Sequence, residues 1–122
     1  MSNRIFITGI GTGVGKTLTS ACVTEALQAD YWKPVQTGLE EGTDTETVKA
    51  LLSNTVSVCH KEVYCLKEPA SPHLAARLEQ VKIEVAPILQ QAEIIQPEDR
   101  PLVIEGAGGL MVPLNEEVFT LD

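Results

Sequence analysis

Short apolar runs and helical patterns alternate along the chain. Residues 5–8 form a short, mostly apolar run that favours a strand, and residues 102–104 form a continuous apolar run of the kind found in buried parallel strands. Between them, apolar residues recur at spacings of three and four over residues 17–29, 45–52 and 84–95, which predicts amphipathic helices. Strands that alternate with helices indicate an α/β fold, with a mostly parallel sheet and helices on both of its faces.

The spacing also predicts which helical side chains face the sheet. The expected faces are Leu18, Ala21, Cys22 and Ala26 in the first helix, and Ile88, Leu89, Ala92 and Ile95 in the last. Shorter elements are expected at residues 31–35, 56–58 and 63–66 as strands and at 72–80 as a helix. Because proline cannot donate to the hydrogen-bond ladder of a sheet, either the ladder of the strand at 31–35 ends at Pro34 or this strand lies at a sheet edge.

A glycine-rich loop connects the first strand to the first helix. Residues 9–17 read GIGTGVGKT, and the order strand, glycine loop, helix is the one that a phosphate-binding loop needs. Backbone N–H groups of such a loop approach phosphate oxygens closely, Lys16 can reach the β- and γ-phosphates, and the Thr17 hydroxyl can bind Mg²⁺. The common pattern has four residues between its first glycine and Gly-Lys-Thr, whereas five follow Gly9 here.

Two polar residues, Lys33 and Thr37, are expected at or just beyond a strand end. Ligands of open α/β sheets bind at this edge, which favours a chemical role for both residues. A solvated surface lysine is the alternative for Lys33. Asp44 precedes the helix at 45–52 and is a natural N-cap there, so metal binding by Asp44 has to be argued from elsewhere.

Glu105 stands at the carboxyl end of the apolar run at 102–104. Phosphoryl-transfer enzymes hold Mg²⁺ with a carboxylate at such a strand end, usually an Asp. A surface glutamate would be unremarkable, but residues 106–109 read GAGG and form a second glycine-rich loop. This neighbour favours the metal role for Glu105.

Composition narrows the class of protein. Apolar residues make up 43% of the 122 residues and aromatic ones 4%, which indicates one globular domain with an aliphatic core. The net charge of −8 argues against a nucleic-acid or anionic-membrane surface. No apolar run approaches a membrane span and no signal pattern is seen, so a cytoplasmic location is expected.

The cysteines indicate reduced thiols. Cys22, Cys59 and Cys65 are odd in number and form no CxxC pair. A zinc site made of Cys59, His60, Cys65 and His73 matches no closed-site spacing and is disfavoured. Both histidines are otherwise expected in loops or at the surface.

Four motifs and one acidic residue, taken in chain order, resemble the dethiobiotin synthetases, the ATP-dependent enzymes that close the ureido ring in biotin synthesis. They are GTGVGKT at 11–17, KPVQTG at 33–38, Asp44, EPASPH at 68–73 and EGAGGLMVPL at 105–114. The resemblance covers nearly the whole chain, and the extra loop residue is this family's own variant of the phosphate-binding motif.

The resemblance implies a P-loop NTPase-like fold and a role for each matching residue. The ATP-binding residues would be Gly13, Val14, Gly15, Lys16, Thr17, Leu18, Asp44, Glu105, Gly106, Ala107 and Gly108. Mg²⁺ would be bound by Thr17, Asp44 and Glu105. Lys33 and Lys16 would be catalytic, and Thr37 and Thr12 would contact the substrate. Members often carry an acidic residue at positions 11 and 13, where this chain has Gly11 and Gly13.

The implied reaction joins 7,8-diaminononanoate, CO₂ and ATP in a homodimer. One amine takes up CO₂ as a carbamate, ATP phosphorylates the carbamate to a carbamic-phosphoric anhydride, and the second amine displaces phosphate to close the ring. Each step develops negative charge on oxygen, which lysines, Mg²⁺ and backbone N–H groups can stabilise.

Two other functions are kept as alternatives. A related P-loop amidoligase or partition-type ATPase would share the fold, but the signature lysine of partition ATPases falls at position 11, which is Gly11 here. A nucleotide-binding switch module without chemistry is also permitted by Gly11, Gly13 and the short length.

A further expectation concerns whether these residues form a whole domain. Only three or four strands are visible, and the family's later segments, which recognise adenine and complete the diamine site across a dimer, have no counterpart. The chain is therefore expected to be a single α/β domain, 1–122, that is incomplete at its C-terminus. Little synthetase activity is expected from these residues alone.

Overall fold

The computed structural model describes residues 4–8, 15–40, 42–67, 72–95 and 99–106. The helices are α1 (Gly15–Leu27), α2 (Asp44–Leu51), α3 (Pro72–Leu78) and α4 (Val85–Ile94). The strands are β1 (Arg4–Ile7), β2 (Asp30–Trp32), β3 (Val35–Thr37), β4 (Cys59–His60), β5 (Tyr64–Leu66) and β6 (Leu102–Glu105).

The main sheet has the strand order β1-β6-β2-β4, and every neighbouring pair is parallel. The last described strand, β6, therefore lies between the first two of the sequence. Its register sets Ile104 beside Phe6 on one side and beside Trp32 on the other. The expected α/β fold with a parallel sheet is confirmed.

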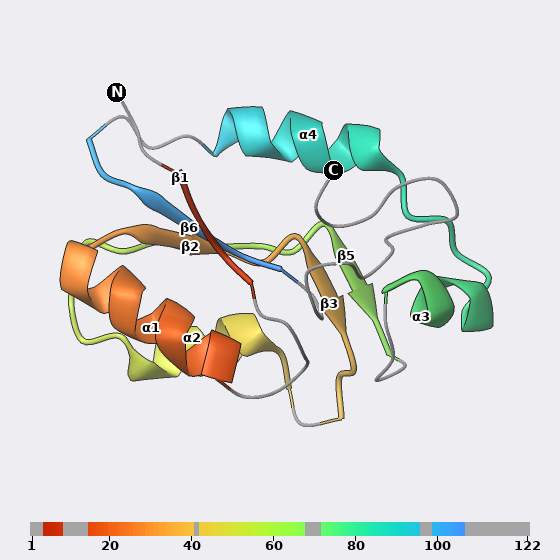
Figure 1. The fold of residues 1–122 in the computed structure, drawn as a ribbon, viewed down its shortest axis with the longest axis horizontal. Helices are drawn as coiled ribbons and strands as arrows, with labels where there is room; N and C mark the ends of the chain where they lie inside the picture. The colour runs from red at the N-terminus through yellow and green to blue at the C-terminus, as the bar shows by residue number, and fades with distance from the viewer. Residues whose placement is uncertain (1–3, 9–14, 41, 68–71, 96–98, 107–122) are drawn as a thin grey trace.

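Helices cover both faces of this sheet, with α1 and α2 on one side and α4 on the other (Figure 1). Successive residues of a strand point to opposite faces, and the core divides accordingly. Tyr31 and Val103 pack with Ala21 of α1 and Val48 of α2. On the other face Trp32 packs with two residues from the α4 segment and Leu102. The set comprises Trp32, Ala92, Ile95 and Leu102.

A second, two-stranded parallel sheet is formed by β3 and β5. It packs with α3 around a small core made of Val35, Leu66, Ala75, Ala76 and Ile83. The expected single strand at 31–35 is thus wrong, because the chain divides it between two sheets at Lys33 and Pro34. Pro34 has no N–H to donate, and its carbonyl instead accepts from the backbone N–H groups of Val63 and Tyr64.

The face that α1 turns to the sheet differs from the expected one. Leu18 is 52% exposed, and Cys22 and Ala26 are also exposed. The buried residues of α1 are Thr17, Ser20, Ala21 and Thr24, which share one face at helical spacing. Small side chains let a helix approach a sheet closely, and the hydroxyl of Ser20 bonds to the carbonyl of Lys16 in its own helix.

Smaller corrections concern the other elements. Leu89 of α4 is 60% exposed, although Ala92 and Ile95 are buried as expected. The strand expected at 56–58 lies instead at Cys59–His60.

Within the described ranges, no helix is long and apolar enough to cross a membrane. The three cysteines are free thiols, as expected.

Candidate active site

The candidate site lies where β2 and β6 end beside the first turn of α1. Lys33 directly follows β2, and Glu105 is the last residue of β6, the neighbouring parallel strand. Parallel strands place their carboxyl ends at one edge of a sheet, so the two side chains meet there. Together with Thr17 and Asp44 they form a cluster that we call the Lys33 cluster (Thr17, Lys33, Asp44 and Glu105).

Glu105 is at the centre of the Lys33 cluster and has no exposed surface. Its Oε2 accepts a hydrogen bond from the Thr17 hydroxyl at 3.0 Å and one from the Lys33 ammonium at 3.3 Å. Its Oε1 accepts from the Tyr31 hydroxyl at 2.7 Å. These donors satisfy both oxygens of a buried carboxylate that would otherwise be costly to desolvate.

Lys33 pairs with two carboxylates at once. Its ammonium group contacts Asp44 Oδ2 in addition to Glu105, and the lysine is 5% exposed. Lysine is rarely buried without such partners. The alternative of a solvated surface lysine is therefore wrong for Lys33.

Asp44 reaches Lys33 because the segment after β3 turns sharply. Gly38 and Gly42 have positive φ angles of 77° and 86°, which glycine adopts without strain. The backbone N–H of Asp44 donates to Gln36 Oε1 at 3.0 Å, so a β3 side chain fixes the start of α2. No local pattern in the sequence around Gln36 indicates this contact.

The expectation that Asp44 caps its helix is wrong. The N-cap of α2 is Thr43, whose side chain accepts a hydrogen bond from the backbone N–H of Glu46. Both Thr and Asp are good N-cap residues, so the sequence alone did not decide between two adjacent candidates. With the cap supplied by Thr43, the Asp44 carboxylate is left to contact Lys33.

Lys16 adds a second positive charge to the same edge. Its ammonium group donates to the carbonyl of Gly106 at 3.2 Å, which joins the start of α1 to the end of β6. Partial burial, and next the positive charge of Lys33, lower the pKa of Lys16, while Glu105 and Asp44 act in the opposite direction. Two lysines and two carboxylates thus share one edge of the sheet.

The donor set of the Lys33 cluster fits a hard divalent cation. Thr17, Asp44 and Glu105 supply oxygen atoms only, which is the preference of Mg²⁺, and this ion usually takes one or two carboxylates. The Lys33 ammonium already pairs with both carboxylates, Asp44 and Glu105. The two carboxylates therefore stabilise positive charge at this place. No group of three or more His, Cys, Asp or Glu residues that could hold a metal occurs in the described part of the chain.

The zinc hypothesis is not supported by the described side chains. His60 Nε2 lies 2.8 Å from Asp30 Oδ2, and the adjacent Cys59 packs in the core that α1 and α2 cover. Neighbouring residues of a strand point to opposite faces, which separates this pair. His60 belongs to β4 rather than to a loop.

The described residues include only some of the other residues that were assigned a role from the sequence. Thr12, Gly13, Val14, Ala107 and Gly108 lie outside the described residues. Thr37 ends β3 and is half-buried, whereas Gly15 and Leu18 are exposed on the first turn of α1. The roles assigned to them stay predictions.

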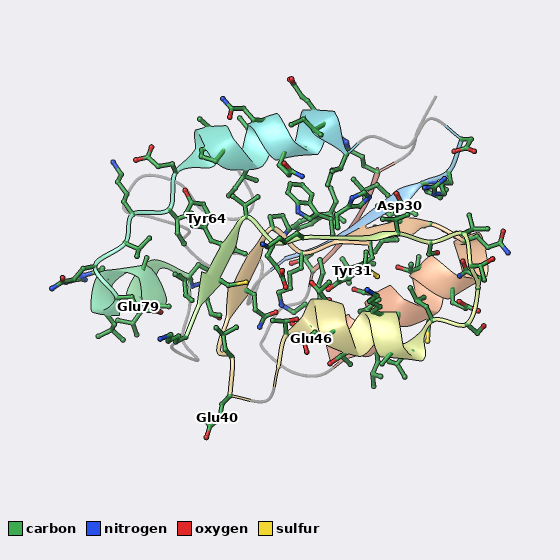
Figure 2. The ribbon with its side chains drawn as sticks, turned by 180° about the vertical axis from the view of Figure 1, so that it is seen from behind. Asp30, Tyr31, Glu40, Glu46, Tyr64 and Glu79 are labelled. Carbon is green, nitrogen blue, oxygen red and sulfur yellow. The ribbon has the colours of Figure 1, made fainter. Side chains whose placement is uncertain are left out.

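Tyr31 is a residue that the sequence reasoning missed. It is fully buried, and Figure 2 shows it between the sheet and the helices α1 and α2. Burial, followed by the charge of Glu105 and the hydrogen bond to it, raises the pKa of Tyr31 far above its usual range. Its hydroxyl therefore keeps its proton and donates to Glu105.

The chain is similar to known proteins over nearly its whole length. A family described as "AAA domain", a P-loop NTPase-type domain, matches residues 3–122. The chain is 50% identical over 122 residues to an ATP-dependent dethiobiotin synthetase of Nitrobacter hamburgensis and 51% identical over 122 residues to one of Agrobacterium fabrum. It is 53% identical over 119 residues to that of Cytophaga hutchinsonii.

These alignments take in 100%, 100% and 98% of the chain, respectively, and in each case 55% of the relative. The chain thus spans about half the length of the curated relatives that it matches.

Proposed function

The chain belongs to the family of AAA domains, and we propose that its protein is an ATP-dependent dethiobiotin synthetase, the name that its curated relatives carry. It would form the ureido ring of dethiobiotin from 7,8-diaminononanoate, CO₂ and ATP. The observation that carries the proposal is the buried Lys33, which contacts Asp44 and Glu105 at the sheet edge where Lys16 also lies. Identity of about 50% to curated synthetases supports it.

The charges of this edge suit phosphoryl transfer from ATP. Lys16 follows the glycine-rich loop and is placed to bind the β- and γ-phosphates, with backbone N–H groups at the start of α1 adding partial positive charge. The loop residues Gly13, Val14 and Gly15 and the later residues Gly106, Ala107 and Gly108 are proposed to complete the phosphate contacts. Fixed positive groups of this kind lower the barrier because charge moves on to oxygen.

Lys33 is proposed to act on the reacting atoms themselves. Its ammonium is held by two carboxylates and by burial, so its position is fixed before substrate arrives. From the end of β2 it would face the transferred phosphoryl group and the carbamate oxygen. Substrate contacts are proposed for Thr37, at the end of β3, the next strand in the sequence, and for Thr12.

Thr17, Asp44 and Glu105 are proposed to hold Mg²⁺ together with the nucleotide. When bound, Mg²⁺ would neutralise phosphate charge and polarise the phosphoryl oxygens. The three side chains converge through their shared contacts: Thr17 donates to Glu105, and Lys33 links Glu105 to Asp44. No activated Ser, Cys or His is required by this chemistry.

A cytoplasmic homodimer is part of the proposal. Free thiols at Cys22, Cys59 and Cys65 suit a reducing compartment. The dimer is carried over from the resemblance to the synthetases, in which a partner subunit completes the diamine site.

Turnover of the full-length protein tests the function. The protein is incubated with diaminononanoate, bicarbonate and ATP, and dethiobiotin is measured by mass spectrometry beside phosphate release. We expect both products in equal amounts and neither without the diamine. Nucleotide binding without dethiobiotin formation would instead support the switch-module alternative.

A further inference from the structure

The two carboxylate oxygens of Glu105 accept hydrogen bonds from different residues. Tyr31 donates to Oε1 at 2.7 Å, whereas Thr17 and Lys33 donate to Oε2. One oxygen thus faces the core of the protein, and the other faces the Lys33 cluster. A carboxylate without the first contact could rotate about its last bond, since terminal sp³–sp² torsions have broad minima.

The Tyr31 ring is itself held in place. It has no exposed surface and packs with a set of buried side chains between the sheet and two helices. These are Ala21, Ala29, Val48 and Val103. In the register of β2 and β6, Tyr31 lies beside Val103, and Glu105 follows two positions later on the same face.

We propose that Tyr31 is a positioning residue that orients Glu105, so that Oε2 is the oxygen offered to a Mg²⁺-bound nucleotide. The inference rests on the proposed function, because it takes the Mg²⁺ role of Glu105 from there. Hydrogen-bond partners of metal-binding carboxylates typically change metal affinity by roughly 10- to 100-fold when they are removed.

A purely structural role for the hydroxyl predicts something different. If it only satisfied a buried carboxylate oxygen, its loss would lower the stability of the protein and leave the effect of Mg²⁺ on nucleotide binding unchanged. The informative quantity is therefore the ratio of nucleotide affinities with and without Mg²⁺.

The matched variants are Tyr31→Phe and Tyr64→Phe. Each removes one hydroxyl and keeps the ring, and the Tyr64 hydroxyl also makes a hydrogen bond, from the backbone N–H of Glu84 at 3.0 Å. Tyr64 is the first residue of β5, and Figure 2 shows it away from Tyr31. Binding of a non-hydrolysable ATP analogue to the full-length protein is measured calorimetrically in saturating Mg²⁺ and in EDTA.

We expect Tyr31→Phe to reduce the Mg²⁺-dependent gain in affinity by about 10-fold or more, with binding in EDTA changed less than about twofold. Tyr64→Phe should match the wild type in both conditions. An undiminished gain in Tyr31→Phe, or an equal loss in Tyr64→Phe, would overturn the inference. A wild-type protein without any Mg²⁺-dependent gain would overturn it as well.

A double-mutant cycle with Glu105→Gln provides a second test. If Tyr31 acts through Glu105, adding Tyr31→Phe to Glu105→Gln should change the Mg²⁺-dependent gain by less than about twofold, whereas independent effects would multiply. Failure of the proposed function has a different signature. A protein that makes no dethiobiotin, but loses its Mg²⁺-dependent gain in Tyr31→Phe, would refute the function and uphold the inference.

Discussion

The ammonium nitrogen of Lys33 lies 3.3 Å from Oε2 of Glu105, although the two residues are 72 positions apart in the sequence. They meet because β6, the last described strand, inserts between β1 and β2. Trp32 pairs with Ile104 in the register of β2 and β6. Lys33 follows Trp32 in the sequence and Glu105 follows Ile104. The strand order therefore creates the centre of the candidate site.

The first prediction concerns Lys33, which is expected to support chemistry more than nucleotide binding. An interaction that is stronger in the transition state than in the ground state lowers kcat when it is removed and leaves ground-state binding nearly unchanged. In the full-length protein, Lys33→Ala should reduce kcat by roughly 10²- to 10³-fold, the scale of one oxyanion-hole donor, while Mg-ATP affinity changes by a few-fold.

Lys82→Ala is a suitable control, because Lys82 is an exposed lysine in the segment between α3 and α4. Steady-state turnover and calorimetric binding of Mg-ATP are measured for both variants. A Lys33→Ala protein with near-normal turnover, or with a loss confined to ATP affinity, would identify Lys33 as a binding or structural residue.

The second prediction concerns Asp44 as a Mg²⁺ ligand. Asp44→Asn keeps the size of the side chain and removes its charge, so the Mg²⁺ concentration that half-saturates nucleotide binding should rise at least about 10-fold. Glu46→Gln removes a neighbouring charge from the same first turn of α2 and should leave that concentration unchanged. Equal responses of the two variants in a Mg²⁺ titration would contradict the assignment.

Several features of the site could be predicted from the residues alone. The strand, glycine loop and helix around Lys16 and the apolar run before Glu105 are local patterns, and β1, α1 and β6 follow them. The neighbour relation between β2 and β6 is not local. No periodicity in either strand encodes which parallel strand lies beside it, so only the resemblance to a family brought Lys33 and Glu105 together in advance.

The misassigned residues have specific physical causes. The hydrophobicity of Leu18 favoured it as a core residue, yet the small residues Thr17 and Ser20 are buried and Leu18 is exposed. Capping of α2 was the alternative role for Asp44, but Thr43 is the cap, and the Asp44 carboxylate pairs with Lys33 instead. Tyr31 was missed because a buried aromatic in a strand looks like ordinary core until its hydroxyl is placed.

The third prediction separates stability from the candidate site. Asp30, at the opposite end of β2 from Lys33, is 2% exposed and accepts hydrogen bonds from Arg100 at 2.6 and 3.4 Å. Burial by itself would raise the pKa of Asp30, but hydrogen bonds from Arg100 and His60 outweigh it and hold that pKa below the usual value. The carboxylate is therefore charged and depends on these donors.

Arg100→Met keeps an apolar stem and leaves Asp30 short of a donor, so the free energy of unfolding should fall by about 1–3 kcal/mol. Arg77→Met, at an exposed position in the last turn of α3, should change it by less than about 0.5 kcal/mol. Urea unfolding measures both values. Mg-ATP affinity should be unchanged in Arg100→Met below its unfolding transition, and a large loss of affinity would contradict the separation of the two ends of β2.

The fourth prediction is a pH dependence of stability that comes from Glu25. Its carboxylate on α1 accepts hydrogen bonds from the side chains and backbone N–H groups of Ser53 and Asn54, just beyond α2. The Ser53 side chain contributes most, followed by that of Asn54, and together they lower the pKa of Glu25 from 4.5 to about 2. The folded protein therefore favours the charged form more than the unfolded chain does.

A lowered folded-state pKa fixes the sign of this effect. The stabilisation is fully present above the unfolded-state value of 4.5 and is lost as the pH falls through that value toward about 2. Glu25→Gln resembles the protonated side chain, so it should be less stable than the wild type at pH 7, and the difference should shrink between about pH 5 and 2. Urea midpoints across this range measure the difference, with Glu93→Gln on an exposed position of α4 as the control. A difference between wild type and Glu25→Gln that stays constant with pH would show that these hydrogen bonds do not favour the charged carboxylate.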